Sequence, residues 1–95
     1  MYIRNTTFTY DPAQEDKLLR VIDEQMLPAF RQLPGFVSYA AGFDRAAQRG
    51  VSIMVWDNLE LAAGVRTMLV GIVQQLEAVG IRLDPAQIYE LVRQV

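Results

Sequence analysis

The sequence predicts an α+β fold in which two helices pack on one face of an antiparallel sheet. The chain has 95 residues, enough for a single domain over residues 1–95. Hydrophobic residues make up 52% and charged residues 21%, a balance typical of folded domains and far from that of disordered chains. Short segments rich in aromatic and β-branched residues alternate with two longer segments whose apolar residues recur at helical spacing.

The first strand and the first helix follow one another directly. Residues 2–10, YIRNTTFTY, have the composition of a strand. Asp11 and Pro12 come next, and they suit the N-cap and the first position of a helix. The helix is expected over residues 12–33, with an apolar face made of Leu18, Ile22, Met26, Ala29 and Leu33. Pro28 lies inside this pattern and predicts a kink, because its ring clashes with the carbonyl four residues earlier.

A hairpin and a second helix occupy the middle of the chain. Residues 36–44 and 51–56 read as two antiparallel strands joined by a polar loop. Asp57 and Glu60 have the spacing of a capping box, which predicts that the second helix begins there. Its apolar stripe ends at Gly80, a typical residue just beyond a helix.

The last segment, residues 87–95, is ambiguous. Ile88, Leu91, Val92 and Val95 have helical spacing, and this pattern by itself favours a helix over a strand. If the segment is a strand instead, the element order becomes βαββαβ, the ferredoxin-like plait.

The predicted strands are apolar on both faces. In the third strand, Val51, Ile53 and Val55 alternate with Met54 and Trp56. Two helices cover only one face of such a sheet, so the second apolar face needs another cover. A second copy of the chain supplies it most simply, and we expect a homodimer with a self-complementary interface.

The composition excludes several classes of function. A net charge of −2, a pI near 4.9 and dispersed cations argue against nucleic-acid binding. The chain has no Cys and no His, which removes the commonest metal ligands, the usual haem ligand and the usual general base. We therefore expect no cofactor and no metal. No signal peptide or membrane-spanning run is recognisable, so we expect a cytoplasmic protein without a membrane partner.

Several segments resemble a known family. LPGF (33–36), the strand ending at Asp44, VSIMVWDNLELA (51–62) and the terminal YELV (89–92) resemble the antibiotic-biosynthesis-monooxygenase-like group of dimeric α+β barrel proteins. The resemblance implies that residues 87–95 contain the fourth strand, that two sheets face each other in a dimeric barrel, and that each subunit keeps a pocket between sheet and helices.

The same resemblance implies an activity. Members of this group include cofactor-free oxygenases of aromatic polyketides, so the chain is expected to be a cofactor-independent monooxygenase of a small aromatic or polyketide-like ligand. The alternative is a non-catalytic small-molecule-binding or structural dimer. Haem-degrading relatives also exist, but they need a proximal His, which this chain lacks.

Three residues are candidates for catalysis. Trp56 lies at a corner where some relatives place Trp and Asn near the substrate, although it also suits an interface anchor. Asn5 is unusual in a strand interior, where it either points into a pocket or faces solvent. Tyr39 has a polar tip that suits a cavity wall, or a structural partner for its hydroxyl.

Three more residues are candidates for substrate binding. Arg66 and Tyr89 are polar-tipped side chains that could line the pocket, and a Tyr and Arg pair could bind and polarise a phenolate or enolate. Asn58 belongs to the same corner as Trp56, and its alternative role is that of a helix cap.

Overall fold

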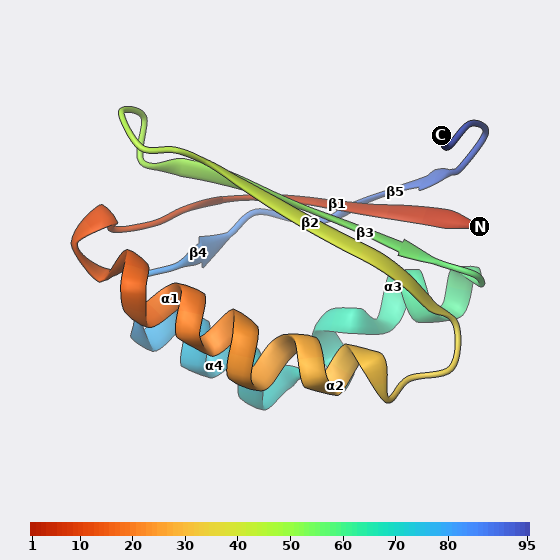
Figure 1. Ribbon diagram of the computed structural model, residues 1–95, viewed down its shortest axis with the longest axis horizontal. Coiled ribbons are helices and arrows are strands. Elements are labelled where there is room, and N and C mark those ends of the chain that lie inside the picture. The colour runs from red at the N-terminus through yellow and green to blue at the C-terminus, as the bar shows by residue number, and fades with distance from the viewer.

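The computed structural model describes residues 1–95 and shows one antiparallel sheet with every helix on the same face (Figure 1). Its elements are β1 (Tyr2–Thr9), η1 (Pro12–Gln14), α1 (Glu15–Val21), η2 (Ile22–Met26), α2 (Leu27–Arg31), β2 (Phe36–Asp44), β3 (Arg49–Trp56), α3 (Leu59–Met68), α4 (Val70–Ala78), β4 (Arg82–Leu83) and β5 (Gln87–Glu90). The strands lie in the order β2-β3-β1-β4, and β5 pairs with the other half of the same edge of β1 that β4 occupies. This is the predicted ferredoxin-like plait, with its fourth strand divided into β4 and β5.

The C-terminal segment is a strand, and the helix favoured by its apolar spacing does not form. Asn5 of β1 lies opposite Gln87, and Tyr2 lies opposite Glu90. Pairing with β1 satisfies backbone groups of the segment that a lone amphipathic turn would leave exposed to water. Only Ile88 of the apolar set packs against the core, whereas Val92 is 73% exposed.

The first helical segment contains a π-helical turn directly before Pro28, where a kink was predicted. In η2 the N–H of Leu27 donates to the carbonyl of Ile22, five residues earlier. Because Pro28 has no N–H and its ring crowds the preceding turn, a wider turn at this point relieves the clash. The ribbon runs from α1 to α2 without a break (Figure 1).

The second helical segment differs from the prediction in two places. Asn58 is the N-cap, and its Oδ1 accepts a hydrogen bond from the backbone N–H of Leu61 at 2.8 Å. The Asp57–Glu60 capping box therefore does not form, because the cap lies one residue later. The helix is also interrupted at Leu69, with φ −116° and ψ 34°, so that α3 and α4 are separate elements. Gly80, with φ +91°, ends α4 as predicted.

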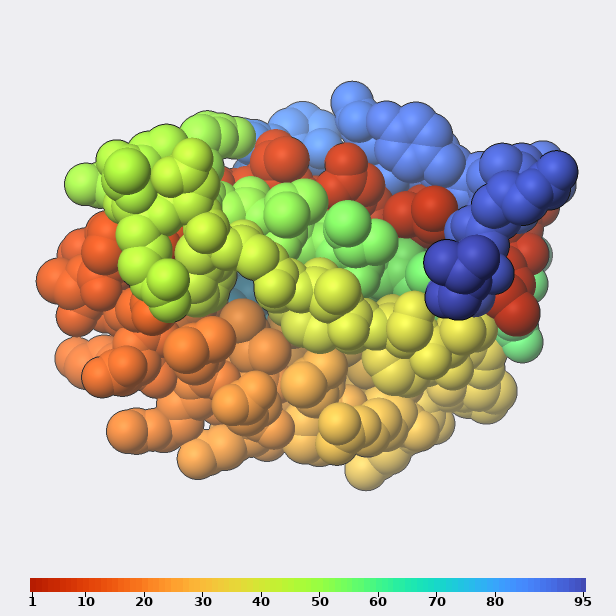
Figure 2. All heavy atoms as spheres, turned by 45° about the horizontal axis from the view of Figure 1, so that its top comes forward, coloured from red at the N-terminus to blue at the C-terminus, as the bar shows by residue number.

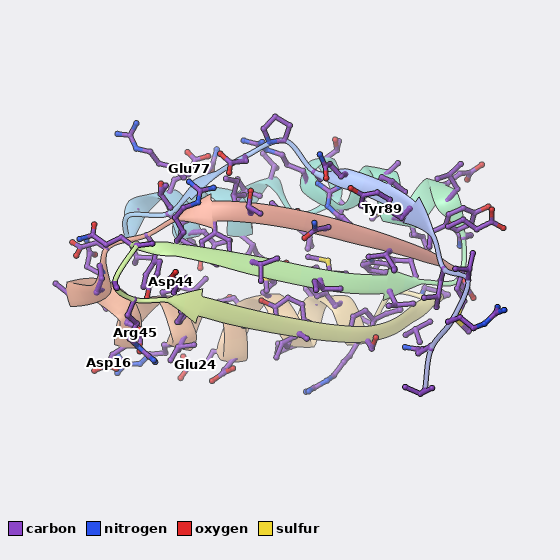
Figure 3. The ribbon with its side chains drawn as sticks, turned by 90° about the horizontal axis from the view of Figure 1, so that it is seen from above. Asp16, Glu24, Asp44, Arg45, Glu77 and Tyr89 are labelled. Carbon is purple, nitrogen blue, oxygen red and sulfur yellow. The ribbon has the colours of Figure 1, made fainter.

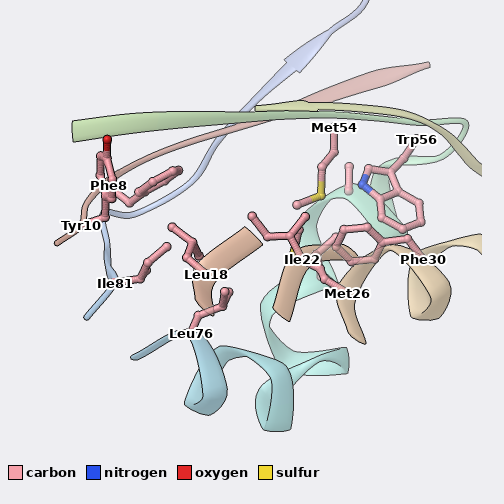
Figure 4. Packing of buried hydrophobic residues seen from close by; sticks show 12 residues of the cluster. Phe8, Tyr10, Leu18, Ile22, Met26, Phe30, Met54, Trp56, Leu76 and Ile81 are labelled. Carbon is pink, nitrogen blue, oxygen red and sulfur yellow. The ribbon is translucent and has the colours of Figure 1, made fainter. Parts of the chain in front are cut away.

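The sheet has one face covered by helices and one face without them. The hydrophobic core lies between sheet and helices, and its fully buried large side chains are Trp56, Phe30 and Leu18 (Figure 4). On the other face β2, β3, β1 and β5 lie side by side with no helix over them (Figure 2). We call the face covered by helices the inner face and the face without helices the outer face. No helix of the chain is long and apolar enough to cross a lipid bilayer.

The register assigns each strand residue to a face. In β1, Arg4, Thr6 and Phe8 are buried on the inner face, so Ile3, Asn5 and Thr7 belong to the outer one. A register shift between Phe36 and Ser38 changes the alternation in β2. Phe36 consequently packs against the core together with Tyr39 and Phe43. Simple alternation would place Phe36 on the face opposite to Tyr39 and Phe43.

Candidate functional site

A cavity lies between the inner face of the sheet and the helix layer. Its volume is about 70 Å³, and its mouth opens to solvent. Of its 18 lining residues, 13 are hydrophobic, and they come from the strands, from η2, α2, α3 and α4, and from the turns beside them. The other five are Arg4, Thr6, Ser52, Arg66 and Asp84, and Tyr39, one of the 13, adds a phenol hydroxyl. An apolar pocket with a few convergent polar groups is the usual form of a small-molecule site.

Arg4 is the most deeply buried charged residue of the cavity wall, with 8% of its surface exposed. Strand alternation directs it inward from β1, where its Nη1 donates to the carbonyl of Ala62 at 3.0 Å and to that of Ala63 at 3.4 Å. Burial lowers the pKa of Arg4, and the positive charge of Arg66 lowers it further. Its guanidinium nevertheless remains protonated at any physiological pH.

Arg66 brings a second cation to the same cavity from the last turn of α3. Its Nη2 lies 4.0 Å from Oε1 of Glu77, and both of these side chains are about half exposed, at 53% and 54%. An ion pair of this length and exposure is weak. Arg66 is therefore free to bind a ligand at the rim.

Tyr39 contributes a phenol from β2, next to Ser52 of β3. Burial raises the pKa of Tyr39 to about 12, and the Ser52 side chain only partly offsets this effect. Tyr39 is therefore a neutral hydrogen-bond donor near pH 7 and does not act as a base there.

Asp84 is the one carboxylate in the cavity wall, and it is already paired. Its Oδ2 accepts from Thr7 Oγ1 at 2.6 Å and from Arg49 Nη2 at 2.7 Å. These two hydrogen bonds lower the pKa of Asp84. The carboxylate is thus held as a structural link between the strands and has no free proton-accepting role.

The structure brings two of the six predicted site residues into the cavity. Tyr39 and Arg66 line it, as the pocket hypothesis expects. Asn58 is the N-cap of α3 and does not reach the cavity. Trp56 is completely buried and does not line the cavity. Its ring packs edge-to-face against Phe30, with the ring centroids 5.8 Å apart.

Asn5 and Tyr89 lie on the outer face, so the expectation that Asn5 points into a pocket beneath the helices is corrected. The alternation of β1 turns Arg4 and Thr6 inward and thereby turns Asn5 outward. Ile3 lies opposite Tyr89 in the β1–β5 pairing, and Tyr89 is 49% exposed on that face (Figure 3). Oδ1 of Asn5 is enclosed there without a hydrogen-bond partner.

Arg4 is the functional candidate that sequence reasoning missed. The signal was present, because Tyr2, Phe8 and Tyr10 share one face of β1 and Arg4 has the same parity. An Arg at an inward position of a mostly apolar strand face is rarely buried unless its charge has a hydrogen-bonding or ionic partner.

Comparison with known proteins identifies the fold. No protein-family model matches the chain, and no curated protein matches it either. Among solved structures, the monooxygenase from the gene ActVA-Orf6 of Streptomyces coelicolor, in complex with nanaomycin D, has a TM-score of 0.74 and 16% identity over 99% of this chain and 89% of that chain.

Two further structures agree. SnoaB, a cofactor-independent oxygenase from Streptomyces nogalater, has a TM-score of 0.70 and 18% identity over 99% of this chain and 95% of that one. A candidate antibiotic biosynthesis monooxygenase from Deinococcus radiodurans has a TM-score of 0.72 and 22% identity over 100% and 96% of the two chains. The predicted resemblance is confirmed at the level of fold: the chain has the fold of the antibiotic-biosynthesis-monooxygenase-like proteins.

Proposed function

We propose that this chain, which has the fold of the antibiotic-biosynthesis-monooxygenase-like proteins, is a cofactor-independent monooxygenase of a small aromatic substrate. The cavity between sheet and helices carries the proposal. It combines a largely apolar wall with Arg66, Arg4 and the neutral phenol of Tyr39. Such a set of groups binds an aromatic body and stabilises negative charge on its oxygen.

The proposed reaction begins with an electron-rich phenol or anthrone that ionises easily. The cavity offers no His and no free carboxylate to accept a proton, so the proton leaves to water at the cavity mouth. Arg66 and Tyr39 then stabilise the resulting phenolate or enolate by charge and by hydrogen bonding.

Oxygen enters through the substrate carbanion. The carbanion donates electrons to O₂ and forms a carbon–oxygen bond, which gives a substrate hydroperoxide after protonation. Loss of water from the hydroperoxide leaves a carbonyl. One O₂ is consumed for each methylene converted to a carbonyl, with one water released, and the substrate supplies all the reducing electrons.

Oxygen uptake tests the proposal. Metal-free protein is incubated with dithranol, an anthrone, and uptake is followed with an electrode while mass spectrometry detects the quinone. We expect uptake above the rate without protein, and a ~10²-fold slower reaction for Arg66→Gln, because a charge-stabilising donor is lost. Equal rates with and without protein for dithranol, with no gain of oxygen in the product, would contradict the proposal.

A non-catalytic binding protein is the second candidate. The absence of an available general base in the cavity favours it, since Asp84 is paired and Tyr39 stays protonated. This candidate predicts that aromatic ligands bind in the cavity without oxygen uptake or a new product.

We also propose that the functional unit is a homodimer formed through the outer face. Val37, Ile53 and Tyr89 are 39–49% exposed there, and no charged side chain stands among the central outer residues Ile3, Asn5, Ala40, Ile53 and Gln87. A second copy of this surface would cover the apolar side chains.

A further inference from the structure

The cavity contains an uncompensated positive charge. Of its three charged wall residues, Asp84 is neutralised by Arg49 outside the cavity, which leaves Arg4 and Arg66 facing each other's field. Glu77, the acid nearest to Arg66, is 4.0 Å away and half exposed. A buried cation without an acidic partner is costly, and proteins usually retain one where an anion binds.

Arg4 has donors to spare on its cavity side. Both of its hydrogen bonds to protein use Nη1, which leaves Nε and Nη2 without a protein acceptor. The fully enclosed side-chain atoms that lack a partner are Asn5 Oδ1, Tyr10 Oη and Trp56 Nε1, so the free Arg4 nitrogens are not sealed off. Because the residue as a whole is 8% exposed, the space that these nitrogens reach is the cavity.

The two tethers to α3 also fix the direction of the guanidinium. A planar fork held by one nitrogen presents its other edge in a set orientation, and this edge fits the two oxygens of a carboxylate. A carboxylate also has enough lone pairs to accept from Arg66 at the same time. The rest of the wall is mostly apolar and suits an aromatic ring, which would extend from the enclosed volume of about 70 Å³ into the open mouth of the cavity.

We propose that the ligand of this cavity is an aromatic carboxylate, and that Arg4 binds its carboxylate group together with Arg66. This inference deepens the proposed function and rests on it only for the location of the site. The monooxygenase proposal concerns the oxygen that reacts, whereas this one concerns a separate acidic group that selects and orients the substrate.

Two probes of equal size test the charge requirement. Binding of 1-naphthoate and of 1-naphthamide to the wild-type protein is measured by isothermal titration calorimetry at pH 7 and low salt. The two share a ring system and differ in charge. We expect naphthoate to bind at least ~10-fold more tightly, because charge-assisted hydrogen bonds to two guanidiniums replace neutral ones.

Variants identify the residue responsible. In Arg4→Met the preference for naphthoate should fall by ~10-fold or more while naphthamide affinity stays within ~2-fold, since only the charged contact is removed. Arg20→Met, which removes an exposed cation of α1 outside the cavity, is the matched control and should retain the full preference. If Arg4→Met does not fold by circular dichroism, Arg66→Gln replaces it, with an expected loss of ~3–10-fold.

The melting temperature distinguishes a binding role of Arg66 from a structural one, because the loss of a structural contact would lower it. Arg66→Gln should leave the melting temperature of the free protein unchanged or raise it by ~1–3 °C, because it relieves repulsion with Arg4, while it weakens naphthoate binding. Equal affinity of the wild type for both probes, no binding of either, or a full preference in Arg4→Met would each overturn the proposal.

The two proposals fail separately. A naphthoate preference that depends on Arg4, with no oxygen uptake from dithranol above the rate without protein, supports the carboxylate site and rejects the oxygenase. Oxygen uptake by the wild-type protein, with no preference between naphthoate and naphthamide, supports the oxygenase and rejects the carboxylate site.

Discussion

The two faces of the sheet are built from the same strands but differ in their polar groups. The inner face accepts Arg4, Thr6 and Ser52 among its buried residues, next to a cavity. The outer face is nearly uncharged at its centre and has Ile53 40% exposed. A helix layer provides carbonyl groups and space for polar side chains, whereas a bare sheet face has neither. Under the two proposals above, the inner face binds a ligand and the outer face binds a second copy of the chain.

Ile53→Asp on the outer face should have the largest effect, and it tests that face as an interface. A symmetric dimer would bury two like charges without partners, so its dissociation constant should rise by at least ~10³-fold. Sedimentation velocity measures the change, and circular dichroism checks that the subunit stays folded. Gln75→Glu adds the same charge on α4, on the other side of the molecule, and should sediment like the wild type. A wild-type protein that is monomeric at micromolar concentration would remove the basis of the dimer.

Trp56→Ala tests the inner face as the core of the fold. Trp56 has no exposed surface and packs edge-to-face against Phe30 and Phe36. Its removal should lower the free energy of unfolding by ~3–5 kcal/mol, as expected for a large aromatic side chain replaced by Ala. Urea denaturation measures the loss. A loss below ~1 kcal/mol would show that the inner face tolerates a cavity there.

Tyr39 gives the stability of the inner face a dependence on alkaline pH. Burial raises its pKa to about 12, above the ordinary value of 10.0, so its contribution is complete below pH 10 and is lost as the pH rises toward 12. The wild type should lose ~1–3 kcal/mol more than Tyr39→Phe over this range. Parallel urea curves at pH 9, 10 and 11 compare the two proteins. Tyr89→Phe, on the outer face, is the control and should follow the wild type.

Gly71→Ala has the smallest expected effect and tests the solvent side of the helix layer. A Cβ built at Gly71 of α4 meets no atom within 4 Å, so Ala should stabilise the helix by ~0.5–1 kcal/mol. Gly50 is the contrasting position, because a Cβ there would come within 2.3 Å of the Phe8 ring on the inner face. Gly50→Ala should destabilise the protein by ~1–3 kcal/mol, and thermal melts measure both changes. A stabilising Gly50→Ala would mean that Phe8 moves without loss.

The sequence alone determined the features that short-range chemistry controls. Aromatic and β-branched residues marked β1, β2 and β3, and Asp11 with Pro12 marked the start of the first helical segment. Gly80 marked the end of α4 through its positive φ. In each case the conformational preference depends on a residue and its immediate neighbours, so a single sequence is enough to predict the element.

Tertiary structure decided what depends on distant partners. Residues 87–90 form a strand because β1 offers them backbone hydrogen bonds, which outweigh a helical pattern of apolar side chains. The shift between Phe36 and Ser38 rotates Phe36 onto the core side, and no local signal in β2 marks it. Arg4 became a site residue only when the carbonyls of Ala62 and Ala63, nearly sixty positions away, came within reach of its guanidinium. The physical reason is common to all three, because pairing and burial energies are set by groups that only the folded chain brings together.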